Sequence, residues 1–327
     1  MCVKNISSVP EERKLFMEVF VGIDSIPRSL NNPVLTIGNF DGVHRGHQTL
    51  FQRVRDWASK LNGEAVVVTF DPHPLRVLRP GNGPLFITPH DRKLQLIAAS
   101  GIDVTVVIPF DHRFAQISAT DFVTELLVRK LGVRAIVVGY DYRFGRGREG
   151  DIAFLENMGK VYGFEVQTVS AIEIDGTMVS STMIRKCIQD GALAEASRLL
   201  GRPYEISGTV VRGRNRGGRL LGFPTANIRI HEHAPPKRGV YVVEAVVGGK
   251  VYGGAANLGY NPTFGDTELS LEVHLSGFDQ DIYDQVITVR FLERLRDEQR
   301  FSGIEELVAQ IKKDCEKAKA LLEAGRR

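Results

Sequence analysis

Two patterns of hydrophobic and polar positions divide the chain. In the first half, short runs of consecutive apolar residues alternate with stretches in which apolar residues recur every three or four positions. The runs are typical of strands buried on both faces, and the longer spacing is typical of helices with one buried side. The five predicted strands are 34–37, 65–70, 104–108, 135–138 and 164–169. Such strands, alternating with helices, predict a parallel sheet with helices on both faces, a doubly wound α/β domain over about residues 15–187.

Three helices of this half are indicated by their faces or their first residues. Apolar residues from Leu50 to Leu61 recur on one helical face. The pair Thr88-Pro89 predicts a helix with a capping threonine and a proline at its first position. Ser118 and Asp121 predict a further helix with a capping-box-like start.

The second half has a different rhythm. A short helix is predicted over 192–200, ending at Gly201. After it come strand-like runs separated by glycine, asparagine, aspartate and proline, and several short strands with such turns favour a compact β-barrel. The runs are 206–211, 240–247, 251–257, 269–275 and 286–291, and a closing amphipathic helix is predicted over 304–322. We expect two domains, 1–187 and 188–327.

The composition narrows the class of protein. The 327 residues are 43% hydrophobic and 25% charged, as in soluble globular proteins, and the net charge of +3 is too small to indicate nucleic acid as a partner. The three cysteines lie far apart, so we expect neither a disulfide framework nor a zinc site. With no signal-peptide pattern and no apolar run of membrane length, we expect a cytoplasmic protein without a membrane partner. The oligomeric state is left open.

The first segment with a chemical pattern is G-N-F-D-G-V-H-R-G-H at 38–47, between a predicted strand and a predicted helix. Ligands of open α/β sheets bind beyond the carboxyl ends of strands, and a helix N-terminus favours phosphates. Glycines at 38, 42 and 46 let the backbone approach a phosphate closely. His44 and His47 can both donate to a triphosphate, which favours nucleotidyl transfer. The alternatives are a glycine-rich turn with two surface histidines and, less favoured, a zinc site.

Two later segments fit the same interpretation. Residues 139–148 combine arginine, glycine and aromatic residues, which suit a phosphate-bearing ligand with a flat ring, although a basic loop is the alternative. Residues 180–185 place hydroxyls and Arg185 at a predicted helix start, where they can hold a triphosphate or simply cap the helix. The prolines of 70–74 are interpreted as shaping a turn.

These four segments resemble, in order, the FMN adenylyltransferase module of bacterial FAD synthetases. Tyr142 stands where that family's pattern has phenylalanine. The resemblance implies a Rossmann-like nucleotidyltransferase domain in which His44 and His47 take part in catalysis. The ATP-binding residues that it implies are Gly38, Phe40, Asp41, Gly42, His44, Gly46, His47, Ser181, Thr182 and Arg185. The FMN-binding residues that it implies are Asp141, Arg143 and Phe144.

The second half contains an Arg/Gly-rich run, 208–219, that leads into G-F-P-T-A-N at 222–227. A glycine-rich loop between strands can hold phosphates through backbone N–H groups, although a short RNA-binding tract is the alternative. Thr225 and Asn227 lie two apart on an extended segment and offer oxygen ligands to Mg²⁺ carried by ATP. Glu272 and His274 alternate with apolar neighbours, so they share one strand face. Glu272 can accept a proton from a substrate hydroxyl, or the two can form a solvent-facing polar pair.

Segments 222–227, 238–241, 257–264, 272–274 and 291–296 are similar, in order, to the riboflavin kinase module. The resemblance implies a six-stranded barrel, Mg²⁺ at Thr225 and Asn227, and Glu272 as the base for the ribityl 5′-hydroxyl. The kinase ATP-binding residues that it implies are Gly213, Gly217, Arg219, Gly222, Pro224, Thr225 and Asn227.

Together the two modules span about residues 16–322. They imply an enzyme that converts riboflavin to FMN, and FMN to FAD, with ATP. The alternatives are a nucleotidyltransferase with a non-catalytic barrel and a nucleic-acid-binding barrel.

Overall fold

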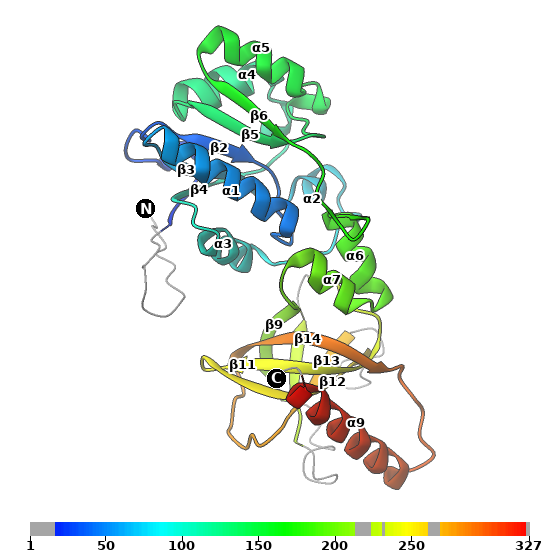
Figure 1. The fold of residues 1–327 in the computed structure, drawn as a ribbon. Coiled ribbons are helices and arrows are strands. Elements are labelled where there is room, and N and C mark those ends of the chain that lie inside the picture. The colour runs from blue at the N-terminus through cyan, green and yellow to red at the C-terminus, as the bar shows by residue number, and fades with distance from the viewer. Residues whose placement is uncertain (1–16, 213–223, 231–232, 261–268, 325–327) are drawn as a thin grey trace. The chain divides into compact units, whose positions relative to one another are not determined.

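The computed structural model describes residues 17–212, 224–230, 233–260 and 269–324. Contacts between residues divide the chain into two compact units, which meet between Ser180 and Ser181 (Figure 1). The predicted boundary after residue 187 falls inside helix α6 (Ser181–Asp190). The two units are described separately below.

The first unit is built on a six-stranded sheet with the order β1-β4-β3-β2-β5-β6, and every neighbouring pair is parallel. The strands are β1 (Glu18–Val21), β2 (Val34–Ile37), β3 (Ala65–Asp71), β4 (Val104–Pro109), β5 (Ala135–Gly139) and β6 (Glu165–Val169). The helices of eight or more residues are α1 (Arg45–Lys60), α3 (His90–Ala99), the π-helical η3 (Phe122–Lys130) and α5 (Ile152–Tyr162). Shorter elements are η1 (Ile23–Ser25), α2 (Pro74–Leu78), η2 (Phe114–Gln116), α4 (Ala119–Asp121), η4 (Arg146–Arg148), β7 (Glu173–Ile174) and β8 (Thr177–Met178).

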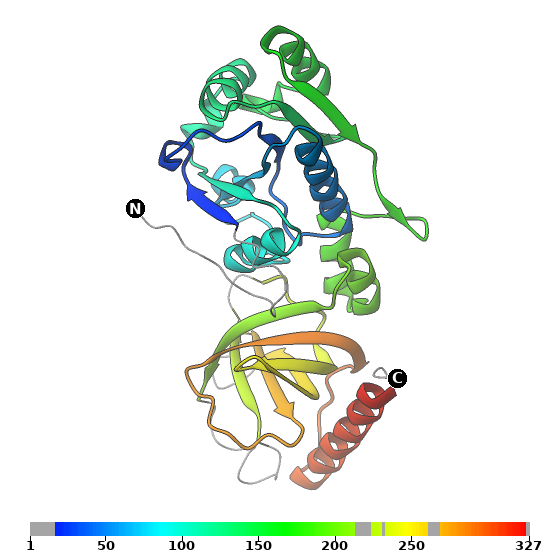
Figure 2. The ribbon, with the colours of Figure 1, turned by 60° about the vertical axis from the view of Figure 1, so that its left-hand side comes forward.

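Alternate residues of the central strands are buried on opposite faces of this sheet. Val67 of β3 packs with residues of α1 and α3, whereas its neighbours Val66 and Val68 pack with residues of η3 and α5. All three valines are fully buried. Figures 1 and 2 show helices on both sides of the sheet, so the predicted doubly wound α/β architecture is confirmed.

Three local expectations for this unit were incomplete or wrong. Strand β1 was not predicted, because it adds at the edge of the sheet beside β4 and only its two middle residues are buried. The hairpin β7–β8 was also not predicted. Helix α3 begins at His90, with Pro89 as an N-cap that makes no side-chain hydrogen bond, so the predicted threonine cap is wrong. Thr88 lies one position before the cap, and its backbone N–H donates to the carboxylate of Asp41. The predicted start at Ser118 is confirmed, because its side chain accepts from the N–H of Asp121.

The second unit begins with α6 and α7 (Leu193–Leu200) and continues as a closed antiparallel barrel with the order β10-β13-β12-β11-β14-β9. Its strands are β9 (Tyr204–Val211), β10 (Ala226–Ile230), β11 (Gly239–Val247), β12 (Lys250–Tyr260), β13 (Leu269–Leu275) and β14 (Val286–Arg296). Five of them correspond to the predicted runs, and β10 is the extended segment that carries Asn227. The predicted barrel and its terminal helix are confirmed (Figure 2).

The terminal helix α9 (Ile304–Ala324) is fastened to the barrel by packing and by one ion pair. Ala318 is buried against Val242 and Ala255 of the barrel wall. The guanidinium of Arg296, at the end of β14, donates from Nε and Nη2 to the carboxylate of Asp314 on α9, at 2.7–3.1 Å. The side chains are 17% and 10% exposed, so water screens this pair only weakly.

Asp314→Asn tests this attachment. Because both side chains are mostly buried, we expect a loss of about 2–3 kcal/mol, between the effects of a surface ion pair and a fully buried one. Calorimetric melting of the whole chain measures the loss, while the fluorescence of Trp57, the single tryptophan, follows the first unit separately. Glu323→Gln is the matched control, since its pair with Lys319 on the same helix is exposed. Equal effects of the two substitutions would contradict the attachment.

Candidate active sites

The strand order places two of the predicted loops next to each other. Strands β3 and β4 lie on one side of β2, and β5 and β6 lie on the other. The connections that leave β2 and β5 therefore run in opposite directions across the sheet. Strand β2 pairs with β5 at Val34 and Leu35, but with β3 along its whole length to Ile37. Open α/β sheets bind ligands in the crevice beyond such a point. The segments that follow β2 and β5, residues 38–44 and 140–151, both begin there.

The loop 38–44 turns back on itself through unusual backbone conformations. Phe40, Gly42 and Val43 have φ of 50°, 89° and 39°, in the left-handed region that residues with a side chain rarely adopt. A Cβ at Gly46 would lie 3.2 Å from the ring of His44, so a larger residue there would have to displace that ring slightly. This loop therefore depends on its surroundings to keep its shape.

Two stacked imidazoles lie at the start of α1. His44 is the N-cap, and its Nδ1 accepts from the backbone N–H of His47 at 3.3 Å. An accepting nitrogen carries no hydrogen, so a neutral His44 ring has its proton on Nε2. The ring planes differ by 19° and their centroids are 3.5 Å apart. The two histidines therefore lie side by side at the N-terminus of α1.

Two more predicted residues of this loop support its shape. The carboxylate of Asp41 is 4% exposed and accepts from the backbone N–H groups of Ile87 and Thr88, at 3.1 and 3.0 Å. The ring of Phe40 is buried, with its edge against Phe51 and His47. Both side chains face protein, so they fix where the loop backbone lies.

The segment after β5 divides into exposed polar residues and buried rings. Asp141 and Arg143 are exposed, and Arg143 pairs with Asp151 at 3.3 Å. Phe144 is 7% exposed and belongs to the core of the unit, stacked on Tyr142. In this structure, therefore, Phe144 holds the segment to the sheet and the polar residues are accessible.

Ser181, Thr182 and Arg185 lie in the first two turns of α6. This helix belongs to the second unit, whereas the histidine pair belongs to the first. Ser181 and Arg185 are half-buried, and Thr182 is exposed.

In the barrel, the predicted carboxylate stands in a row of polar residues across three strands. Glu272 of β13 is opposite Asn227 of β10 and, on its other side, opposite Asn257 of β12. Directly opposed residues project from the same face of a sheet, so the three side chains are neighbours. The flanking Leu271 and Val273 are fully buried, which confirms the predicted alternation.

Glu272 is half-buried, and burial raises the pKa of its carboxyl group. His274, two residues along the strand, lies with Nδ1 2.9 Å from the carbonyl oxygen of Pro224. Since a carbonyl can only accept, Nδ1 is the donor, and the contact ties the segment before β10 to β13. Thr225 and Asn227 are half-buried beside it. The predicted residues Gly213, Gly217, Arg219 and Gly222 lie outside the described residues.

Family models match both units of the chain: FAD synthetase over residues 26–183 and riboflavin kinase over residues 200–322. Bifunctional riboflavin kinase/FMN adenylyltransferase of Escherichia coli K12 is 42% identical, over 86% of this chain and 90% of its own length. The Haemophilus influenzae protein of the same name is 39% identical, over 93% and 99%. The chain belongs to the bifunctional riboflavin kinase/FMN adenylyltransferase family.

A solved structure of a related sequence has the same fold. It is described as a macrolide-efflux protein from Streptococcus pneumoniae, is 33% identical, and superposes with a TM-score of 0.82 over 90% of this chain and 97% of its own. That description concerns the other protein. Among the residues described here, no helix is both long and apolar enough to cross a membrane.

One buried residue at the site of the first unit was not predicted from the sequence. Lys93 of α3 is 7% exposed, and its ammonium donates to three acceptors at the carboxyl ends of β2 and β3. A signal was present, because Lys93 precedes Ile97 by four residues and so occupies the buried face of a helix that also buries Leu94 and Ala98. A lysine on such a face is rare unless it is paired.

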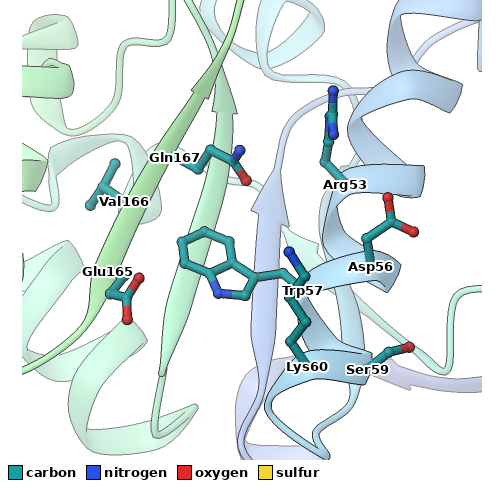
Figure 3. Close-up of a pocket in the computed structure, with 8 residues that line it drawn as sticks. All are labelled: Arg53, Asp56, Trp57, Ser59, Lys60, Glu165, Val166 and Gln167. Atoms are coloured by element: carbon teal, nitrogen blue, oxygen red, sulfur yellow. The ribbon is translucent and has the colours of Figure 1, made fainter.

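A groove of ≈ 700 Å³ lies elsewhere on this unit, between α1 and β6 (Figure 3). The indole of Trp57 lies between the helix and Gln167 of the strand. Lys60 is the last residue of α1 and Glu165 the first of β6, so the groove opens toward the amino ends of the strands. Ligands of such sheets bind at the opposite edge, and we do not assign the groove to catalysis.

The raised pKa of Glu272 leads to a prediction about stability. A folded protein that keeps a proton which its unfolded chain has lost becomes less stable as the pH rises through the folded pKa. Glu272→Gln removes this ionisation, so we expect the variant to be more stable than its parent at neutral pH. The difference should shrink as the pH falls below the carboxyl range. Melting temperatures measured across pH test this, with exposed Glu316→Gln of α9 as the control. A less stable Glu272→Gln at neutral pH would contradict it.

Proposed function

We propose that the first unit transfers the adenylyl group of ATP to FMN and that the barrel transfers the γ-phosphoryl group of ATP to riboflavin. Membership of the bifunctional family supports both activities in one chain. The observation that carries the residue-level assignment is the stacked pair of His44 and His47 at a helix N-terminus on the carboxyl edge of a parallel sheet.

In the first reaction centre, His44 and His47 contact the phosphates of ATP. Transfer of a nucleotidyl group needs in-line positioning and donors that stabilise charge as it spreads over the α-phosphate and the leaving pyrophosphate. The attacking FMN phosphate is already an anion, so no base is required. The proton on Nε2 of His44 and the N-terminal N–H groups of α1 supply donors of this kind.

Other residues of this centre shape it or extend it. Gly38, Gly42 and Gly46 let the backbone come close to the triphosphate, and Phe40 and Asp41 fix the loop from behind. We also assign Ser181, Thr182 and Arg185 to ATP. The FAD synthetase match supports this for Ser181 and Thr182, since it extends through residue 183. Asp141 and Arg143 contact FMN, and Phe144 holds their segment in place.

In the barrel, Glu272 takes the proton of the ribityl 5′-hydroxyl as that oxygen attacks the γ-phosphorus. A carboxyl group whose pKa is raised by burial is a better base than an exposed one, provided that it stays ionised at the working pH. ATP is bound by Pro224, Thr225 and Asn227. The predicted ATP-binding residues Gly213, Gly217, Arg219 and Gly222 are assigned to the same nucleotide. The cross-strand pairing of Asn227 with Glu272 supports placing nucleotide and base next to each other.

Mg²⁺ reaches this site with ATP, and we assign it to the hydroxyl of Thr225 and the amide oxygen of Asn227. Hard oxygen donors of this type suit the ion, and bound Mg²⁺ offsets charge on the transferring phosphoryl group. Among the residues that the structure describes, no cluster of three or more His, Cys, Asp or Glu side chains could hold a metal.

We also propose that the protein works in the cytoplasm on ATP and flavins, without nucleic acid or membrane partners. The small net charge supports the absence of a nucleic-acid partner.

The direct test is to incubate the purified chain with riboflavin and Mg–ATP and to separate the flavins by chromatography. FMN should appear with ADP, and then FAD with pyrophosphate. A chain that forms FMN but no FAD under any condition would remove the assignment of the first unit.

His44→Ala and His47→Ala separate the two reactions. Loss of one preorganised donor in the transition state should slow FAD formation by roughly 10²–10³-fold. FMN formation, measured in the same preparation, should be nearly unchanged because the barrel is not altered. Equal slowing of both reactions would point to a general loss of folding, and the Trp57 fluorescence melt checks that outcome.

Glu272→Gln is the complementary substitution. It keeps size and hydrogen bonding but removes the base, so riboflavin phosphorylation should fall by roughly 10²–10⁴-fold. Conversion of supplied FMN to FAD should survive. The control is Val273→Ala. Val273 is fully buried, so its truncation leaves a cavity and should lower stability without a specific loss of kinase rate. If Glu272→Gln phosphorylates riboflavin at the parent rate, the carboxylate is not the base.

A further inference from the structure

Lys93 lies at the junction of three segments of the first unit. It is in the second turn of α3, and its side chain is only 7% exposed. Its Nζ is 3.1 Å from Oγ1 of Thr69 and 3.3 Å from the carbonyl oxygens of Asn39 and Phe70. Asn39 follows β2, while Thr69 and Phe70 end β3. One ammonium group thus joins the carboxyl ends of two neighbouring strands to a helix.

The hydrogen-bond count defines what this group can do. An ammonium has three N–H donors and no acceptor, and here three oxygens receive them. The hydroxyl of Thr69 also donates to the carbonyl of Asn39, at 3.3 Å. With its donors occupied by protein, Lys93 acts on the reaction through the backbone that it holds.

That backbone is the loop that presents the histidine pair. Asn39 immediately precedes the left-handed Phe40, and the loop ends at His44. On the other side, Asp41 accepts from the N–H groups of Ile87 and Thr88, in the segment that leads into α3. The loop is therefore held at two points by residues 87–93.

Nearby carboxylates offset only part of the effect that burial has on the pKa of Lys93. Burial lowers the pKa of Lys93 to about 8, while Asp41 from the loop and Asp71 from β3 oppose this shift. On its own helix, His90 lies with Nδ1 3.7 Å from Oδ1 of Asp71. Loss of the proton leaves two donors for three acceptors and adds a lone pair, so the network of the charged form cannot persist in the neutral form.

We propose that Lys93 is a positioning residue for adenylyl transfer: its ammonium fixes the carbonyl of Asn39 and so the loop that places His44 and His47. The inference rests on the assignment of adenylyl transfer to the first unit. Nothing in it requires Lys93 to touch ATP or FMN.

The first test uses the unsubstituted protein. The kcat for FAD formation from FMN, at saturating substrates, should fall as the pH rises above about 8, where Lys93 loses its proton. A kcat that stays level between neutral pH and strongly alkaline pH would overturn the inference. In Lys93→Arg the group stays charged, so the alkaline fall should be absent whatever the absolute rate. The same fall at the same midpoint in Lys93→Arg would also overturn it.

The second test is Lys93→Met, with Lys160→Met, an exposed lysine of α5, as the matched control. A displaced catalytic loop typically lowers a rate on the order of 10²-fold, so kcat for FAD formation should fall by that factor. The control and the FMN-forming reaction should be unaffected. An unchanged kcat in Lys93→Met contradicts the inference. Loss of the Trp57 unfolding transition also contradicts it, because Lys93 would then maintain the whole unit.

The failure of this inference can be told from a failure of the proposed function. If the first unit does not carry out adenylyl transfer, the unsubstituted protein makes no FAD. If only the role of Lys93 is wrong, the unsubstituted protein makes FAD and the Lys93→Met variant makes it equally well.

Discussion

The carboxylate of Asp41 and the ammonium of Lys93 hold one loop from two sides, and the histidine pair depends on that loop. Asp41 accepts two backbone hydrogen bonds from residues 87 and 88, and Lys93 donates to the carbonyl of Asn39. Between these points the backbone passes through left-handed conformations that are unfavourable for residues with side chains. Such conformations persist only where the surroundings fix them. A parallel sheet provides this setting, since it brings the carboxyl ends of β2 and β3 to one edge where a single helix can reach both.

In the barrel, strand pairing fixes the position of the predicted base. Glu272 is placed between Asn227 and Asn257 by the register of three strands, and buried Leu271 and Val273 fix that register. A one-residue slip would move every side chain to the opposite face, so core packing and the position of the carboxylate are coupled. Burial of the carboxyl group has a cost in stability that packing elsewhere offsets, as at the contact between α9 and the barrel. Both units thus keep a partly desolvated charge beside a fixed backbone.

The sequence predicted most of the fold because the strands carry clear periodicity. Val66, Val67 and Val68 form a continuous apolar run, which is typical of a strand buried on both faces, and all three are fully buried. Strand β1 was not recognised because Glu18 interrupts its apolar residues and only its two middle residues are buried. The start of α3 was misplaced by one residue, because Thr88 resembles a helix cap but lies just before it, where its N–H donates to Asp41, 47 positions away in the chain. Periodicity carries no information about a contact of that kind.

At the sites, too, local spacing was predictable from the sequence, whereas contacts between distant residues were not. The spacing of His44 and His47 within one helical turn made their association foreseeable, and their stacking agrees with it. The link from Lys93 to Asn39 joins residues 54 apart, and no local pattern encodes it. Phe144 was predicted to bind FMN, and its burial in the core shows that an aromatic residue in a loop can also belong to the packing.

We propose that one chain performs two different transfers from ATP at two separate centres. ATP labelled with one phosphorus isotope at the α-position and another at the γ-position, supplied with riboflavin, tests it directly. FMN should carry only the γ-label, and FAD should carry both labels in equal amounts, because its two phosphates come from two separate steps. FAD without the γ-label, or flavin that never acquires the α-label, would contradict the account.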